Sequence, residues 1–289
     1  MLNFNTIQEM VDRAEEQHCP LHEIVIQREI HDSQKTRDEI IAAMEANWQV
    51  MQASIERGIS NTEKSLSGLT GGDAKKLYHY AGKGYMGDEV LKAAAYAVGI
   101  SEVNAVMGRI VACPTAGSCG IVPAALYAAK MERKLADEDI VKALFTAAGI
   151  GMVVDQNASI AGAAGGCQAE CGTAAGMAAG ALVELAGGTP AQIGNAVALS
   201  IKNLLGLVCD PVAGLVEVPC VKRNGFAAIE ALLAADMTLA GIESVIPVDE
   251  VIDAMNRIGK ALPKSLRETS EGGLATTATA QAIEKRIYK

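Results

Sequence analysis

The chain has 289 residues, a formal net charge of −9, and a composition that is 50% hydrophobic but only 3% aromatic. The acidic balance and the lack of a basic stripe argue against a nucleic-acid-binding protein. A chain of this length can bury a substantial core in one or two domains, and its 29 glycines favour closely packed helices over an aromatic-anchored sheet.

Residues 1–58 are predicted to form an amphipathic helical region. The sequence Thr6–Glu9 is typical of a capping box, which marks a helix N-terminus. Apolar residues recur at helical spacing over Ser33–Arg57. This spacing predicts one long helix, with Gly58 as its C-cap. We expect Trp48 to face the core of this region rather than to bind a cofactor.

Residues 59–87 are rich in Gly, Ser, Thr and Lys. Such a stretch is either a linker or a substrate loop whose backbone N–H groups wrap an anion, and both interpretations stay open. Helical patterns then follow one another over 88–98, 119–132, 137–150, 172–187, 190–206, 224–242, 248–261 and 276–288. The short segment Arg109–Cys113 is a candidate extended piece. We therefore predict an all-α fold with a helical region over 1–58 and a larger helical domain over 59–289, or one continuous domain.

The positive mean hydropathy of the chain raises the question of a membrane protein. The most apolar stretch, Ala143–Gly166, is interrupted by Asp155, Gln156 and Asn157. Three adjacent polar residues are costly in hydrocarbon. We therefore predict no membrane span, and a membrane transporter is the most distant alternative.

The seven cysteines form an odd set without disulfide-like regularity. The first strong sequence pattern is amphipathic and predicts no signal peptide, so we expect a cytoplasmic protein. In that reducing compartment, clustered cysteines serve more often as ligands or nucleophiles than as disulfides. Cys19, next to Pro20, is interpreted as a structural residue.

Cys113 and Cys119 bracket the loop CPTAGSCG, which runs into a predicted helix near Gly120. Backbone N–H groups and hydroxyls at a helix N-terminus can bind a carboxylate. Small residues also permit close approach of a ligand. The alternative is a plain loop-to-helix connection with a Ser/Thr cap.

Two further pairs of cysteines lie in the second half of the chain. Cys167 and Cys171 stand four residues apart in GGCQAECG, where the preceding glycines place Cys167 near a helix start and the helix dipole favours a thiolate. Cys209 and Cys220 enclose ten residues with two prolines and one glycine, so this segment must loop. A loop allows its two ends to meet at one ion, and the two pairs together favour a metal site.

The ligand types narrow the choice of metal. Structural zinc needs four ligands and tighter pairs, and the histidines lie far upstream, at positions 18, 22, 31 and 79. Thiolates at long, irregular spacing suit an iron–sulfur cluster better. The missing C-x2-C-x2-C run argues against a ferredoxin-style electron carrier. A cluster with one iron not bound by protein would act instead as a Lewis acid.

The run GGCQAECGTAAGMAAGALVELAGG, followed by CDPVAGLVEVPCVKRN, resembles the α chain of the oxygen-sensitive, iron–sulfur L-serine dehydratases. The segments CPTAGSCGIVPAAL and SGLTGGDAKKL resemble that chain as well, so the likeness covers most of residues 60–245. The resemblance implies a mostly helical catalytic domain that holds a [4Fe-4S] cluster. It also implies conversion of L-serine to pyruvate and ammonia without pyridoxal phosphate.

Roles transfer from this family by motif position. The resemblance implies that Cys167, Cys209 and Cys220 are the cluster ligands and that the other thiols of these motifs, Cys113, Cys119 and Cys171, are packing residues. The loop formed by Thr115, Ala116, Gly117 and Ser118 would receive the substrate carboxylate. Arg223 and Asn224 would lie near the cluster.

One departure from the family pattern concerns the catalytic base. The fused enzymes of the family carry a Ser-Ser-Ser-His-Thr segment in an extra domain, and this chain lacks it. In two-chain members the segment belongs to a β subunit, so the resemblance implies that a β partner is needed. Candidates for the base are therefore a partner histidine or, in this chain, Lys64, His79 or Lys222.

Two alternatives belong to other functional classes. A helical scaffold or regulatory subunit would use the cysteines for a structural metal without catalysis. A pyridoxal-phosphate dehydratase would need a Schiff-base lysine, and no lysine here stands in a recognisable cofactor-binding setting.

Overall fold

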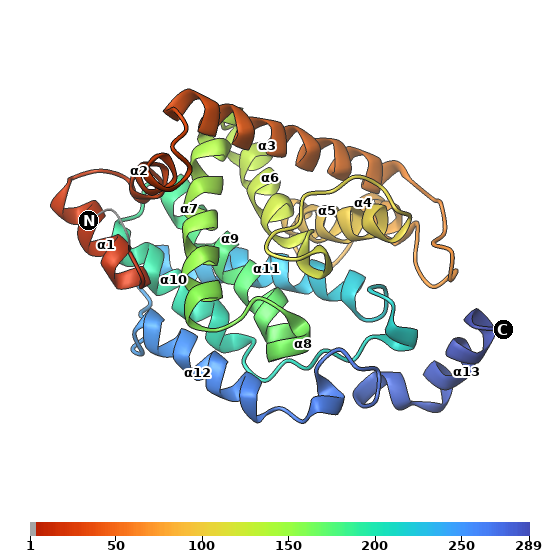
Figure 1. Cartoon of the computed structure of the whole chain (residues 1–289). Helices are drawn as coiled ribbons and strands as arrows, with labels where there is room; N and C mark the ends of the chain where they lie inside the picture. Colours follow the sequence, from red (N-terminus) through yellow and green to blue (C-terminus); the bar gives the residue numbers. More distant parts are fainter. Residues whose placement is uncertain (1–3) are drawn as a thin grey trace.

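The computed structural model describes residues 4–289, and helices make up nearly all of its regular structure (Figure 1). Within these residues no strand is formed, and the only paired extended backbone is an isolated parallel bridge between Cys209 and Arg267. The prediction of an all-α fold is confirmed.

The helices follow one another along the whole chain. In order they are α1 (Ile7–Glu16), α2 (Leu21–Ser33), α3 (Arg37–Ser60), α4 (Asp73–Tyr80), α5 (Asp88–Ala105), α6 (Ile121–Arg133), α7 (Asp137–Asn157), α8 (Gly162–Gly165), α9 (Thr173–Leu185), α10 (Pro190–Asn203), α11 (Cys220–Leu239), α12 (Val248–Ala261) and α13 (Ala278–Ile287). Short 3-10 turns lie at η1 (Ala116–Ser118), η3 (Val212–Gly214), η4 (Lys264–Leu266) and η5 (Gly273–Thr276), and η2 (Gln168–Gly172) is π-helical.

Helix α9 lies at the centre of the molecule, with α6, α7, α10 and α11 packed around it (Figure 1). Every residue of α9 from Thr173 to Val183 is buried. Its small side chains allow this crowding: a Cβ on Gly180 would lie 2.5 Å from Ile150 Cδ1 of α7. The main hydrophobic core extends from Phe4 to Met255 and so includes residues on both sides of position 58. The domain division at that position stays a prediction.

The eight helical segments predicted from residue 88 onward are all present. Each observed helix begins within four residues of its predicted start. The sequence patterns missed α4 and α8, and the candidate extended segment Arg109–Cys113 is irregular rather than a strand.

The long N-terminal helix was predicted with the wrong ends. Gln34 adopts a left-handed conformation (φ 58°) that ends α2, so α3 begins at Arg37, after a complete capping box of Thr36 and Glu39. Gly58 is not the C-cap, because α3 continues to Ser60. Trp48 does face the core: it is 1% exposed, and its Nε1 donates a hydrogen bond to Asp137 Oδ1 at 2.6 Å.

The predicted capping box at Thr6 forms only in part. The Thr6 side chain accepts a hydrogen bond from the Glu9 N–H at 3.0 Å, as expected for an N-cap. The Glu9 carboxylate, however, accepts from the N–H of Asn5 at 2.6 Å. The reciprocal bond of a true capping box would go to Thr6.

Gly58 matters for a different reason, because α3 and α5 cross at Gly58 and Gly99. A Cβ on Gly58 would lie 2.4 Å from the carbonyl carbon of Gly99, which is backbone and cannot rotate away. We expect Gly58→Ala to lower the free energy of unfolding by about 3 kcal/mol, as overpacking does. The matched control is Gly87→Ala, where a Cβ would meet nothing within 4 Å, and the expected loss is below about 1 kcal/mol. Equal urea midpoints for the two variants would contradict the close crossing.

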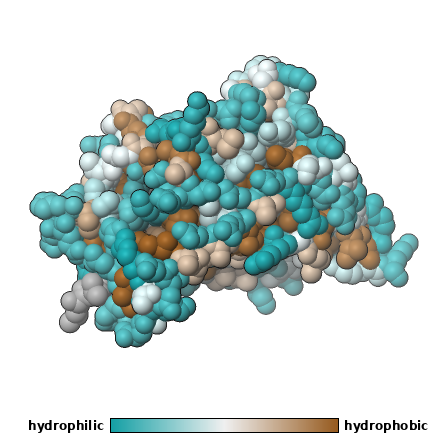
Figure 2. All heavy atoms as spheres, turned by 90° about the horizontal axis from the view of Figure 1, so that it is seen from above, coloured by the Kyte–Doolittle hydropathy of each residue, from teal (hydrophilic) through white to brown (hydrophobic). Residues whose placement is uncertain are grey.

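The polar residues that interrupt the most apolar stretch of the sequence lie on the surface. Asp155, Gln156 and Asn157 are exposed at the end of α7. No helix within residues 4–289 is both long and apolar enough to cross a bilayer. Figure 2 shows the face seen from above, where hydrophilic side chains dominate and hydrophobic ones form separate patches.

Candidate functional site

Three buried thiols approach a common space from three different segments. Cys167 directly precedes the π-helical turn η2, Cys209 follows α10 in extended backbone, and Cys220 is the first residue of α11. They are 3%, 4% and 9% exposed. Electrostatic interactions connect every pair among them. The fold therefore brings together side chains that lie up to 53 residues apart in sequence (220 − 167).

Backbone contacts fix two of these cysteines. Gly166, with φ 77°, turns the chain just before Cys167. Cys209 is held by the C-terminal part of the chain: its N–H donates to Leu266 O at 2.9 Å, and its carbonyl accepts from Glu268 N–H at 2.8 Å. The position of the Cys209 thiol thus depends on a segment distant in sequence.

Burial is the main influence on two of the thiols. Burial, then the charge of Glu170 and the neighbouring thiols, raises the pKa of Cys209. The same influences raise the pKa of Cys220 to about 12. A metal that binds these thiols must displace their protons, because the thiolate is the ligand.

Cys167 differs, because its pKa is lowered. The main cause is the hydrogen bond between Cys167 and Cys171, whose Sγ atoms lie 3.3 Å apart, and the positive charge of Arg223 contributes further. Arg223 also donates to Val208 O at 2.8 Å and to Asp210 Oδ1 at 3.0 Å. Arg223 therefore holds the segment around Cys209 through hydrogen bonds and also acts electrostatically on Cys167.

Asn224 connects the loop at residues 115–120 to the start of α11. Its Oδ1 accepts from Gly120 N–H at 2.9 Å, and its Nδ2 donates to Gly117 O at 2.8 Å and to Cys220 O at 3.0 Å. Asn224 is fully buried. It therefore holds the predicted substrate loop in a fixed position relative to Cys220.

Glu170 is the site residue that the sequence analysis missed. Its Oε1 accepts a hydrogen bond from Thr115 Oγ1 at 2.7 Å, and its Oε2 lies 3.8 Å from Cys209 Sγ. Burial raises its pKa, although the Thr115 hydroxyl acts in the opposite direction. The sequence signal for Glu170 was an acidic residue within a Gly- and Cys-rich motif. In the structure this residue lies in the π-helical turn η2, and such turns often occur at functional sites.

The three lysine and histidine candidates for a base lie around α4. Lys64 Nζ donates to Gly71 O at 2.7 Å, and Lys222 Nζ pairs with Asp73 Oδ2 at 2.8 Å. The His79 ring packs edge-on to Tyr78. For none of the three does the described part of the chain show a contact with the thiols, although Lys222 lies only two residues after Cys220.

The anion that the loop before α4 wraps is a carboxylate of the protein itself. The backbone N–H groups of Gly71, Gly72, Asp73 and Ala74 all donate to the Glu102 carboxylate, at 2.8 to 3.3 Å. Glu102 is 1% exposed. These four donors are therefore already used within the fold.

The convergence of the cysteines on one ion stays a prediction. Among residues 4–289, no three His, Cys, Asp or Glu side chains are arranged as ligands of a single metal ion.

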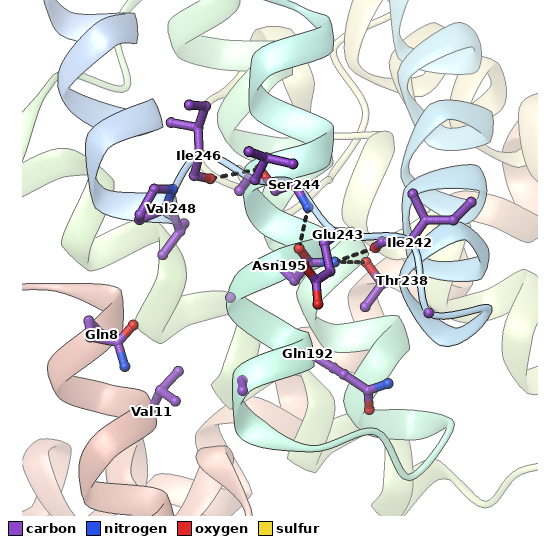
Figure 3. A pocket seen from close by; sticks show the side chains of 16 residues that line it. Gln8, Val11, Gln192, Asn195, Thr238, Ile242, Glu243, Ser244, Ile246 and Val248 are labelled. Carbon is purple, nitrogen blue, oxygen red and sulfur yellow. Dashed lines mark hydrogen bonds between the residues drawn. The ribbon is translucent and has the colours of Figure 1, made fainter.

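A surface cavity lies elsewhere, between α10 and the loop that leads to α12 (Figure 3). Asn195 donates to Thr238 Oγ1 at 3.0 Å and to Ile242 O at 2.8 Å, and accepts from Ser244 N–H at 2.6 Å. These polar groups anchor the loop, and no cysteine lines the cavity. The thiol site is therefore the better candidate for catalysis.

Comparison with known proteins agrees with the cysteine motifs. The model of the serine dehydratase alpha chain family matches residues 16–275. The chain belongs to this family. The resemblance recognised from the cysteine motifs is thereby confirmed.

The similar proteins include both short and long forms. The chain is 51% identical to a probable L-serine dehydratase alpha chain of Bacillus subtilis, over 99% of this chain and 95% of that one. It is 45% identical to the L-serine dehydratase alpha chain of Peptoniphilus asaccharolyticus, over 99% and 98%. L-serine dehydratase TdcG of Escherichia coli is 40% identical over 83% of this chain but only 55% of its own length.

Proposed function

We propose that this chain is the α subunit of an L-serine ammonia-lyase, which converts L-serine to pyruvate and ammonia. The observation that carries the proposal is the meeting of the Cys167, Cys209 and Cys220 thiols beside a loop rich in small and hydroxylated residues. The two relatives that match over nearly their whole length are named as L-serine dehydratase alpha chains, one of them as probable.

The donor set supports a [4Fe-4S] cluster held by Cys167, Cys209 and Cys220. All three donors are soft sulfur atoms and are buried. In a cluster each thiolate binds a different iron, so the ligands need not surround one point. With one iron free of protein ligands, such a cluster supplies a Lewis acid that assists departure of the serine hydroxyl. No pyridoxal phosphate is required.

The chain's own residues would bind and orient the amino acid. We assign the substrate carboxylate to the loop of Thr115, Ala116, Gly117 and Ser118. Asn224 holds this loop against the start of α11, through the two bonds to Gly117 and Gly120 described above. Arg223 places a fixed positive charge next to Cys167, which favours the thiolate form needed in a ligand.

The proton on Cα must pass to a base that the thiols do not provide. Lys64 and Lys222 already hydrogen-bond to Gly71 and Asp73, and His79 packs on an aromatic ring. We therefore assign the base to a histidine of a β subunit and expect a cytoplasmic heterodimer. The long relative TdcG, of which this chain covers 55%, has room for such an additional part within one chain.

The test is anaerobic reconstitution of the purified chain with ferrous iron and sulfide. We expect a brown protein with about four iron and four sulfide per chain, as the cluster stoichiometry requires. We also expect pyruvate formation from L-serine when the β subunit is added. A colourless protein would contradict the cluster. One zinc per chain without lyase activity would support a scaffold, and full activity of the single chain would refute the need for a partner.

A further inference from the structure

The Glu170 carboxylate occupies a cradle built from two glycines. A Cβ on Gly162 would lie 2.5 Å from Glu170 Oε2, and a Cβ on Gly117 would lie 2.9 Å from Oε1. Any side chain at either position would therefore displace the carboxylate. Thr115 Oγ1 donates to Oε1 at 2.7 Å and fixes the group further. The fold thus positions a negative group inside the thiol site.

Within the described residues, no ion pair to this carboxylate is formed. Among the ion pairs of residues 4–289, Arg223 pairs with Asp210 and Lys222 pairs with Asp73, but no lysine, arginine or histidine pairs with Glu170. The charged side chain with the strongest electrostatic effect on Glu170 is another acid, Glu268. A partly buried carboxylate without a cation favours a cationic ligand.

Glu170 also adjoins the loop that we assign to the substrate carboxylate. Thr115 and Gly117 belong to that loop, and both lie against the Glu170 carboxylate. An α-amino acid carries its carboxylate and its ammonium on the same carbon. A site for such a substrate therefore needs its anion-binding and cation-binding groups side by side, and the assigned loop and Glu170 are adjacent in this way.

We propose that Glu170 binds the α-ammonium group of the substrate and thereby selects amino acids over the corresponding hydroxy acids. This assignment rests on the proposed function, and it names the group that recognises the amino acid. Because Glu170 would contact the ammonium and not the reacting Cβ–O bond, its main effect is on binding.

The test compares two unreactive ligands, L-alanine and L-lactate, which differ in having an ammonium or a hydroxyl on Cα. Calorimetry is carried out on the reconstituted complex of wild type, Glu170→Gln and Glu170→Asp. In Glu170→Gln we expect L-alanine binding to weaken about 10- to 100-fold, the value of a charge-assisted hydrogen bond. L-lactate binding should change less than about threefold. Glu170→Asp keeps the charge and should recover part of the preference for L-alanine.

The control is Glu268→Gln, which removes the neighbouring exposed charge but leaves the cradle intact, and should leave the preference within about threefold. Equal weakening of both ligands, or no change in either, would overturn the assignment. So would loss of iron in Glu170→Gln, which would assign the carboxylate to the cluster. A fall in kcat with unchanged KM for L-serine would assign it to proton transfer. Failure of the proposed function itself would appear separately, as wild-type protein without iron or pyruvate formation.

Discussion

The Cys209→Ala variant is expected to keep its helices, to lose iron on anaerobic reconstitution, and to lose about 1000-fold or more of its L-serine dehydratase activity. The fold should persist because the contacts that place Cys209 use its backbone N–H and carbonyl, which alanine retains. Removal of a Lewis acid costs several kcal/mol of transition-state stabilisation, and about 4 kcal/mol corresponds to this factor. Iron and sulfide analysis, together with pyruvate formation in the presence of the β subunit, measures both effects.

The matched controls are the buried thiols that we do not assign as ligands. Cys119 is fully buried in a separate part of the core, and Cys171 touches Cys167 at 3.3 Å. We expect Cys119→Ala and Cys171→Ala to retain iron and activity. A Cys209→Ala protein with full iron content would refute the ligand assignment, and loss of iron in Cys171→Ala would add a fourth thiol to the site.

The Glu102→Ala variant is expected to lose about 4 kcal/mol of unfolding free energy, because it leaves four backbone donors at the start of α4 without their acceptor. Hydrogen bonds to a charged group contribute about 1.5–3 kcal/mol each, and buried donors left unpaired are costly. Some of this loss is offset when water reaches the exposed N–H groups. Urea unfolding measures the loss, and limited proteolysis within residues 65–73 tests whether the loop opens.

Glu89→Ala is the control for this prediction, since Glu89 lies on the same helix α5 and forms a surface pair with Lys92. Such pairs contribute about 1 kcal/mol or less. If Glu102→Ala and Glu89→Ala have the same stability and the same protease resistance, the four bonds to Glu102 do not hold the loop.

The helices after residue 88 were predictable because their end signals are local. Thr189, followed by Pro190 and Gln192, forms a complete capping box with proline in the first turn. Helix α4 was not predictable in this way. Its N-terminus is stabilised by Glu102, about 30 residues later in the chain, and no local pattern reports such a contact. The break at Gln34 was missed because a left-handed residue other than glycine gives little sequence signal.

In the candidate site too, the sequence indicated some residues and gave no clear signal for others. Spacing and flanking residues indicated two cysteine pairs, and the resemblance to the family narrowed these to Cys167, Cys209 and Cys220 as predicted ligands. Glu170 was missed because acids are common on helices. Its importance appears only when Thr115, Gly117 and Gly162 are seen around it.

The pairing of Cys209 with Leu266 and Glu268 also imposes an order on biosynthesis. These partners are synthesised 57 to 59 residues after Cys209 (266 − 209 and 268 − 209). A nascent chain that has produced all three cysteines still lacks the segment that holds Cys209 in place. If Cys209 is a cluster ligand as proposed, the cluster can bind in this geometry only after that later segment has left the ribosome.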